Sequence, residues 1–146
     1  MSLSTLNSVY FIGVGGIGMS ALARYFVANG KTVGGYDKTP TALTDALEDI
    51  GVLIHFKDDI KAIDNAFLNP STTLVVYTPA VPKAHSELNY FIAANFKVLK
   101  RSAILGEITR QTQCLAVAGT HGKTTTTSIL GHLLNVCNAP VTAFLG

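Results

Sequence analysis

The sequence predicts an α/β fold in which helices cover both faces of a parallel sheet, followed by a truncated strand–loop–helix unit. Short apolar runs alternate with segments in which apolar residues recur at helical spacing. Two glycine-rich loops each follow an apolar run and precede a helical pattern. An apolar content of 48% and a net charge of +2 over 146 residues favour a packed core and exclude disorder.

Apolar, β-rich runs mark the expected strands, at 9–12, 32–36, 52–54, 73–77, 98–99, 114–118 and 141–145. Helical spacing predicts helices at 17–29, 41–50, 86–95, 102–111 and 123–135, with a weaker short helix within 58–69. Asn29-Gly30 and Gly51 are typical helix ends, and Ser86 is the expected cap of the helix that begins there. Such alternation indicates a parallel sheet.

Spacing also predicts which helical side chains face the core. The expected inward residues are Ile17, Leu22, Tyr25, Phe26, Leu43, Ala46, Leu47, Ile50, Ile60, Ile63, Phe67, Ile104, Leu105, Ile108, Ile129, Leu130, Leu133 and Leu134. We expect His132 to be structural, because it lies among leucines of the last helix.

A polar stretch at 110–113 precedes a fresh strand–loop–helix pattern, so we expect a domain boundary there, with one domain at 1–111 and the start of a second at 112–146. The second unit is too short to close a sheet of its own. The sequence contains no internal repeat.

Composition excludes several classes of protein. The balance of 11 basic and 9 acidic residues argues against a general nucleic-acid binder. No apolar run approaches the roughly 18 residues of a membrane span, and no secretory signal opens the chain. Cys114 and Cys137 lack metal-ligand spacing, so we expect both to be buried thiols in a reducing cytoplasm.

The first glycine-rich loop, GVGGIG at 13–18, fits the G-x-G-x-x-G pattern between a strand and a helix. Its glycines permit a tight turn and let the backbone approach a diphosphate, which the helix N-terminus stabilises. Asp37 follows the second expected strand, where a carboxylate can accept from a ribose. These features predict a Rossmann-like nucleotide site, although NAD and a UDP-sugar would both fit it. The alternative is a turn that only packs helix on sheet.

The second loop, GTHGKTT at 119–125, contains the Gly-Lys-Thr core of a phosphate-binding loop. It is a shortened variant, because Val117 stands where a standard P-loop has its first glycine. Lys123 could reach the β- and γ-phosphates, and the Thr124 hydroxyl could join a Mg²⁺ shell. The role of His121 stays open. The predicted ATP-binding residues are Gly119, Thr120, His121, Gly122, Lys123, Thr124 and Thr125.

Together these motifs resemble the Mur ligase family of ATP-dependent amino-acid ligases. The resemblance lies in VAGTHGKTT at 117–125, FIGVGGIGMS at 11–20, YTPAVP at 77–82 and LKRSA at 99–103. It implies a UDP-substrate domain followed by the opening of an ATPase domain, in a family whose full enzymes are much longer. The present chain alone is therefore expected not to catalyse ligation.

The resemblance implies UDP-N-acetylmuramate, L-alanine, ATP and Mg²⁺ as ligands, in peptidoglycan precursor synthesis. The muramate carboxylate would attack the γ-phosphate of ATP, and the amine of L-alanine would attack the acyl phosphate. Lys123 would be catalytic, stabilising charge on the transferred group. The expected substrate-binding residues are Gly15, Gly16, Ile17, Gly18, Met19, Ser20, Asp37, His55, Thr78, Pro79 and Ala80.

Some residues keep two interpretations. His55 could equally be a hydrogen-bonded loop histidine. His85 and Glu87 are expected in a solvated cap region, and Arg101 could meet a phosphate or an acidic neighbour, with no ligand role favoured. Two other functions stay open. One is an NAD-dependent oxidoreductase domain, which leaves the second loop without a role, and the other is a nucleotide-sensing module without turnover.

Overall fold

Five parallel strands form a sheet in the order β3-β2-β1-β4-β5. The computed structural model describes residues 3–145. The strands are β1 (Ser8–Ile12), β2 (Thr32–Tyr36), β3 (Leu53–His55), β4 (Thr73–Tyr77) and β5 (Lys97–Lys100). The predicted α/β class is thereby confirmed.

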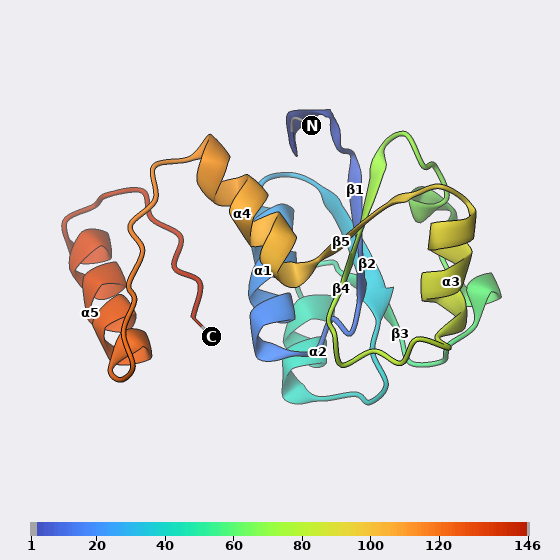
Figure 1. The fold of residues 1–146 in the computed structure, drawn as a ribbon, viewed down its shortest axis with the longest axis horizontal. Coiled ribbons are helices and arrows are strands. Elements are labelled where there is room, and N and C mark those ends of the chain that lie inside the picture. The colour runs from blue at the N-terminus through green and yellow to red at the C-terminus, as the bar shows by residue number, and fades with distance from the viewer. Residues whose placement is uncertain (1–2, 146) are drawn as a thin grey trace.

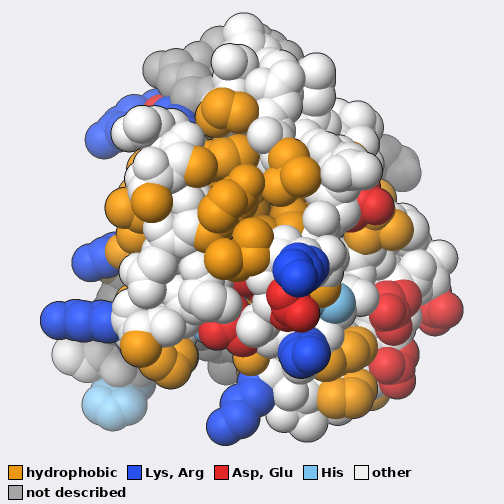
Figure 2. Space-filling view, turned by 90° about the vertical axis from the view of Figure 1, so that its right-hand side faces the viewer, with side chains coloured by type: hydrophobic (Ala, Val, Ile, Leu, Met, Phe, Trp, Pro, Cys, Tyr) orange, Lys and Arg blue, Asp and Glu red, His pale blue; other side chains and the backbone are white. Residues whose placement is uncertain are grey.

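Helices cover both faces of this sheet (Figure 1). One face carries α1 (Ile17–Ala28), α2 (Ala42–Glu48) and α4 (Arg101–Gln111). The other carries α3 (Ser86–Ala93) and the 3₁₀ turns η2 (Ile60–Ala62) and η3 (Asn65–Phe67), while a further turn, η1 (Leu3–Thr5), precedes β1. On the α3 side, hydrophobic side chains gather in the middle of the surface, with charged side chains below them (Figure 2).

The central strand β1 supplies both halves of the core. Val9 and Phe11 pack in the cluster under α1 and α4, whereas Tyr10 and Ile12 pack in the cluster under α3. All five residues of β1 are buried. An uninterrupted apolar run is typical of a parallel strand that is covered on both faces.

Two adjacent glycines let β2 fit between its neighbours. A Cβ on Gly34 would lie 2.5 Å from the Phe67 ring, and one on Gly35 would lie 2.2 Å from the carbonyl oxygen of Phe11. Since the second obstacle is backbone, no side-chain rotation relieves it. The TVGGY sequence of β2 is therefore set by the packing of η3 and β1.

The last part of the chain differs from the prediction. Residues 114–118 and 141–145 are not strands, and only α5 (Lys123–Val136) is regular there. A strand needs a partner for its backbone N–H and C=O groups, and the described chain pairs neither run. No described residue of 112–145 is buried, so the inward prediction for 129–134 is wrong: Ile129 is 57% and Leu133 55% exposed. Cys114 and Cys137 are exposed as well.

Smaller corrections concern helix ends. Region 58–69 contains two 3₁₀ turns rather than one helix, with Ile63 and Phe67 buried. Three residues expected inward, Ile17, Ile50 and Ile60, are exposed; they lie at the start of α1, just after α2 and at the start of η2. The residue that caps α3 is His85. None of the helices within residues 3–145 has both the length and the apolarity needed to span a membrane.

Candidate nucleotide-binding cleft

A cleft of about 780 Å³ opens beside the carboxyl ends of β1 and β4. The order of the sheet reverses between these two strands, and open α/β sheets bind ligands at such a point. Nine of the eleven predicted substrate residues line the cleft: Gly15, Gly16, Ile17, Gly18, Met19, Asp37, Thr78, Pro79 and Ala80.

The glycine loop is fixed by neighbouring backbone. The N–H groups of Gly13 and Val14 both donate to the carbonyl oxygen of Tyr36, at 2.8 and 3.1 Å. Gly13 has a φ of +88°, and a Cβ there would lie 2.8 Å from the Thr78 methyl group. A glycine is therefore required both by the backbone conformation and by the close approach of the loop that follows β4.

Asp37 binds the loop itself. Its Oδ2 accepts from the Gly15 N–H at 2.7 Å, and its Oδ1 accepts from the Thr39 N–H at 3.3 Å. A Cβ on Gly15 would lie 2.9 Å from that carboxylate. Asp37 thus holds the glycine loop while it lines the cleft, and its predicted contact with a ribose stays a prediction.

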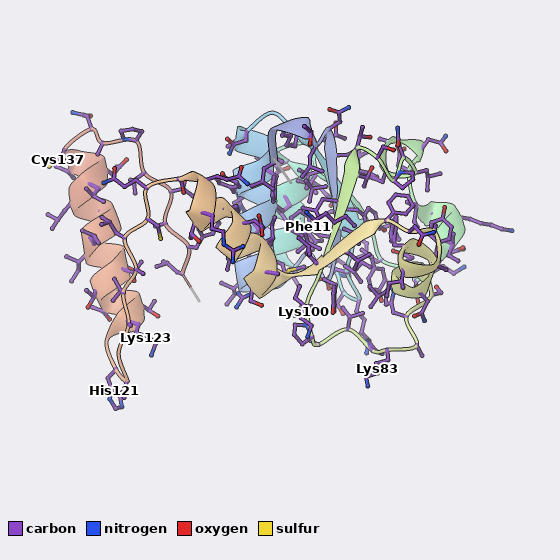
Figure 3. All side chains as sticks on the ribbon, turned by 45° about the horizontal axis from the view of Figure 1, so that its top comes forward. Phe11, Lys83, Lys100, His121, Lys123 and Cys137 are labelled. Atoms are coloured by element: carbon purple, nitrogen blue, oxygen red, sulfur yellow. The ribbon has the colours of Figure 1, made fainter. Side chains whose placement is uncertain are left out.

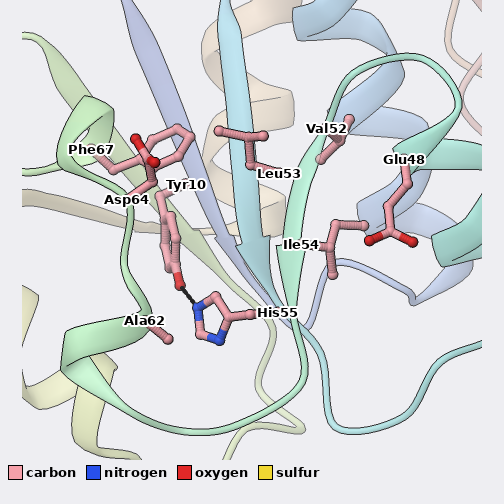
Figure 4. A pocket seen from close by; sticks show the side chains of 9 residues that line it. All are labelled: Tyr10, Glu48, Val52, Leu53, Ile54, His55, Ala62, Asp64 and Phe67. Atoms are coloured by element: carbon pink, nitrogen blue, oxygen red, sulfur yellow. Dashed lines mark hydrogen bonds between the residues drawn. The ribbon is translucent and has the colours of Figure 1, made fainter.

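Ser20 and His55 lie outside the cleft lining. Ser20 is buried in α1, where its hydroxyl donates to the carbonyl oxygen of Ile17. His55 lines a separate pocket of about 320 Å³, and its Nε2 is 2.7 Å from the Tyr10 hydroxyl (Figure 4). Its Nδ1 is 2.9 Å from the carbonyl oxygen of Lys57. The structure therefore groups His55 with a buried network rather than with the glycine loop.

His85 lines the cleft and is buried, which corrects its expected place in a solvated cap region. It is only 5% exposed, its Nδ1 accepts from the Leu88 N–H at 3.4 Å, and that nitrogen lies 3.3 Å from Asp58 Oδ1. Its ring packs edge-on against Tyr36. Within residues 3–145 its Nε2 is buried without a hydrogen-bond partner. Burial lowers the pKa of His85, so the ring is neutral at neutral pH.

Asp58 ties the wall of the cleft to the start of α3. It accepts from the N–H and hydroxyl of Ser86 and from the N–H of Glu87. Burial raises the pKa of Asp58, but these hydrogen bonds and nearby His85 outweigh it and leave the pKa below its usual value. The carboxylate is therefore charged at neutral pH and anchors the loop that precedes η2.

Glu87 is fully buried, which corrects its predicted exposure. The Tyr10 hydroxyl donates to its Oε2 at 2.7 Å and the Asp59 N–H to its Oε1 at 3.2 Å, while His55 Nε2 lies 3.5 Å away. Burial raises the pKa of Glu87 to about 7 and is also the main cause of a raised pKa at Tyr10. The network joins β1, β3 and α3 behind the cleft.

The cleft has further lining residues that were not among the predicted substrate residues: Tyr36, Lys38, Asp58, Val81, Pro82, Ala84, His85 and Arg101. Most of them directly follow strands or flank the 78–80 loop, so their position at the carboxyl edge of the sheet was the available clue. Arg101, for which a ligand role was not favoured, lies against Gly18.

The second loop lies apart from this cleft, at the start of α5 (Figure 3). Gly122 is left-handed, with a φ of +74°, and caps α5. Lys123 folds back over the loop, donating to the carbonyl oxygens of Gly119 at 2.8 Å and Thr120 at 3.5 Å. His121 is exposed at its tip. The predicted ATP-binding residues thus form one continuous loop and first helical turn.

The predicted Mg²⁺ contact is Thr124, which is exposed in the first turn of α5. Among residues 3–145, no group of three or more histidine, cysteine or acidic side chains could hold a metal ion. Mg²⁺ commonly takes phosphate and water oxygens among its ligands, and the Thr124 hydroxyl is the one ligand that we predict from this segment.

The chain is similar to known proteins over the regions that contain both glycine loops. A family model described as "Mur ligase family, catalytic domain" matches residues 8–113. UDP-N-acetylmuramate–L-alanine ligases of Parabacteroides distasonis and Flavobacterium psychrophilum are 57% and 59% identical over 146 residues, which is 100% of this chain and 32% of each relative. The chain thus spans about a third of the length of these relatives.

Two solved structures agree. The UDP-N-acetylmuramate–alanine ligase of Thermotoga maritima has a TM-score of 0.78 at 29% identity, over 90% of this chain and 30% of that one. A murein peptide ligase of Psychrobacter arcticus has a TM-score of 0.76 at 31% identity, over 90% and 27%. Because the family model covers most of the sequence and includes the glycine loop and the cleft, the chain belongs to the Mur ligase family.

Proposed function

We propose that this chain is the N-terminal part of an ATP-dependent ligase that joins L-alanine to UDP-N-acetylmuramate in cytoplasmic peptidoglycan precursor synthesis. Residues 1–111 would bind the UDP-sugar, and residues 112–146 would open the ATP-binding domain. The observation that carries the proposal is the cleft, in a chain that matches ligases of that printed name over its whole length.

The cleft suits a nucleoside diphosphate. The amide N–H groups of the glycine loop and the positive end of α1 favour a diphosphate. Asp37 holds that loop through Gly15 and keeps free lone pairs on both carboxylate oxygens, which could accept from ribose hydroxyls. The sugar would then extend along the loop at 78–80.

The second loop suits the triphosphate of ATP. To bind a phosphate, the Lys123 ammonium would exchange its present carbonyl partners at 119 and 120 for phosphate oxygens. There it would stabilise charge while the muramate carboxylate attacks the γ-phosphorus and ADP leaves. Mg²⁺, held by Thr124, phosphates and water, would neutralise phosphate charge. The amine of L-alanine then attacks the acyl carbon and phosphate departs.

Family membership argues against the other two interpretations. An NAD-dependent oxidoreductase domain gives the loop at 119–125 no role. A sensing module without turnover could use the Lys-Thr pair at the start of α5 to bind nucleotide, so membership of a ligase family is what argues against it.

Titration calorimetry of this chain with UDP-N-acetylmuramate, and with NAD⁺ in a parallel experiment, tests the proposal. We expect saturable binding of the UDP-sugar and none of NAD⁺. Asp37→Ala should weaken binding about tenfold or more, because it frees the glycine loop and removes a ribose acceptor. Asp49→Ala, which removes an exposed carboxylate after α2, is the matched control. Binding of NAD⁺ but not of the UDP-sugar would overturn the proposal.

A further inference from the structure

The last glycine of the first loop lies against an arginine. The three atoms nearest to a Cβ built on Gly18 all belong to the Arg101 side chain, and the nearest, Nη1, would be 1.7 Å away. Gly18 has an ordinary helical backbone, so conformation does not require glycine there. A side chain at 18 would instead displace the guanidinium from its present position. This role adds to the turning, phosphate approach and helix–strand packing expected of the glycines in such a loop.

The topology fixes Arg101 on the ligand side of the sheet. It is the first residue of α4, directly after β5, whose carboxyl end lies at the same edge as the glycine loop. Ile104 and Ile108 of α4 are buried in the cluster that also contains Leu22 and Phe26 of α1. The backbone of Arg101 is therefore held rigidly beside the first turn of α1.

Within residues 3–145, the Arg101 guanidinium makes no ion pair and no hydrogen bond. The amide N–H groups of Gly16, Ile17 and Gly18 likewise have no acceptor in this part of the chain. Arg101 and the three residues that carry these amides all line the cleft, and the Arg101 side chain lies beside Gly18. On another wall, His85 keeps a buried Nε2 without a partner. The buried His85 Nε2 is costly to leave without a partner, whereas Arg101 and the amides at 16–18 are accessible from the cleft and can exchange water for a ligand.

We propose that Arg101 binds the diphosphate of the nucleotide ligand and that Gly18 lacks a side chain in order to seat it. The inference rests on the proposed function for the cleft but adds a residue and a physical role. A guanidinium presents a planar fork of donors that matches two phosphate oxygens, and the amides of 16–18 bind the other side of the same group.

Calorimetric titrations of the 146-residue chain with UDP-N-acetylmuramate and UDP test this inference. Arg101→Ala should weaken the binding of both ligands tenfold to a hundredfold, as expected for a hydrogen bond to a charged group. Arg101→Lys, which keeps the charge and loses the fork, should weaken it less. Arg110→Ala removes a cation from the same helix that already pairs with Glu107, and it should leave both affinities unchanged. Thermal melting establishes that each variant is folded.

Gly18→Ala provides an independent test, because its methyl group would occupy the position of the guanidinium. It should weaken UDP binding as much as Arg101→Ala, and the double variant should bind no worse than either single variant. Further weakening of the Arg101→Ala chain by Gly18→Ala would show that the glycine does not serve the arginine, and would overturn that half of the proposal.

The outcomes separate this inference from the proposed function. Equal affinity of UDP for the native chain and for Arg101→Ala would overturn the role of Arg101 and leave the UDP-sugar proposal standing. If UDP binds in an Arg101-dependent manner but the muramate adds no affinity, the proposed substrate is wrong and Arg101 remains the diphosphate residue. Failure of the native chain to bind either ligand would overturn both.

Discussion

Glu87 is a buried carboxyl whose protonation is tied to folding. Burial raises its pKa from 4.5 to about 7 although Tyr10 and Asp59 donate to it. Between pH 4.5 and about pH 7, Glu87 is therefore protonated in the folded chain and ionised in the unfolded chain. The contribution of Glu87 to the free energy of unfolding is complete below about pH 4.5. It falls as the pH rises to about 7 and beyond, by at most roughly 3 kcal/mol.

Urea unfolding of the native chain and of Glu87→Gln at pH 5 and pH 8 checks this. Between pH 5 and pH 8, the native chain should lose more unfolding free energy than Glu87→Gln does. His55 and His85, whose pKa values burial lowers, stabilise the fold in the opposite direction, but both chains retain them. Glu107→Gln, at a surface carboxyl, is the control. A difference that does not change with pH would refute the assignment.

The burial of polar side chains such as Glu87 could not be predicted from the neighbouring sequence. Glu87 is buried because Tyr10, 77 residues away in the sequence, offers it a hydroxyl. Arg101 lies beside Gly18 because β5 and β1 end at one edge of the sheet. In both cases the partner comes from another strand, whereas the glycine loop could be predicted because its residues are contiguous.

At the scale of elements, β2 contains two glycines, and different atoms lie where a side chain at each position would have to fit. Gly35→Ala would drive a methyl group into the Phe11 carbonyl and should destabilise the fold by about 3 kcal/mol or more. Gly34→Ala would press a methyl group on the buried Phe67 ring and bring it to 2.9 Å from the Leu53 carbonyl oxygen, and should cost about 1–3 kcal/mol. Chemical denaturation gives both values.

Gly106→Ala is the matched control, because a Cβ there meets nothing within 4 Å in α4. It should stabilise the chain by up to about 1 kcal/mol, through helix propensity. Equal losses at 34, 35 and 106 would show that backbone freedom rather than packing sets the need for glycine in β2.

Strands β1 to β5 could be predicted from the sequence to within two residues, because each is a short apolar run between helical patterns. The same reasoning was wrong for 114–118. Its residues have strand character, but strand formation also depends on a neighbour, which the described chain does not provide. Helix α5 was predictable because its hydrogen bonds are internal to the segment.

The molecule as a whole combines a well-buried α/β unit with a segment that buries little. Phe144 packs beside Tyr25 of α1, yet residues 112–145 include no buried side chain. Separate glycine loops serve the two parts, one in the cleft and one at α5. The boundary at 111 remains a prediction, and local stability is the property that should reveal it.

Amide hydrogen exchange should therefore be faster in 112–145 than in β1 and β4. Isolated helices of the length of α5 are marginal in water, and α5 lacks the tertiary burial that stabilises most protein helices. In exchange followed by mass spectrometry, peptides from 8–12 and 73–77 should stay protected long after those from α5 have exchanged. Peptides from α4, which buries Ile104 and Ile108, serve as a helical control and should exchange more slowly than α5. Equal protection of α4 and α5 would mean that residues 112–145 fold together with the sheet as one cooperative unit.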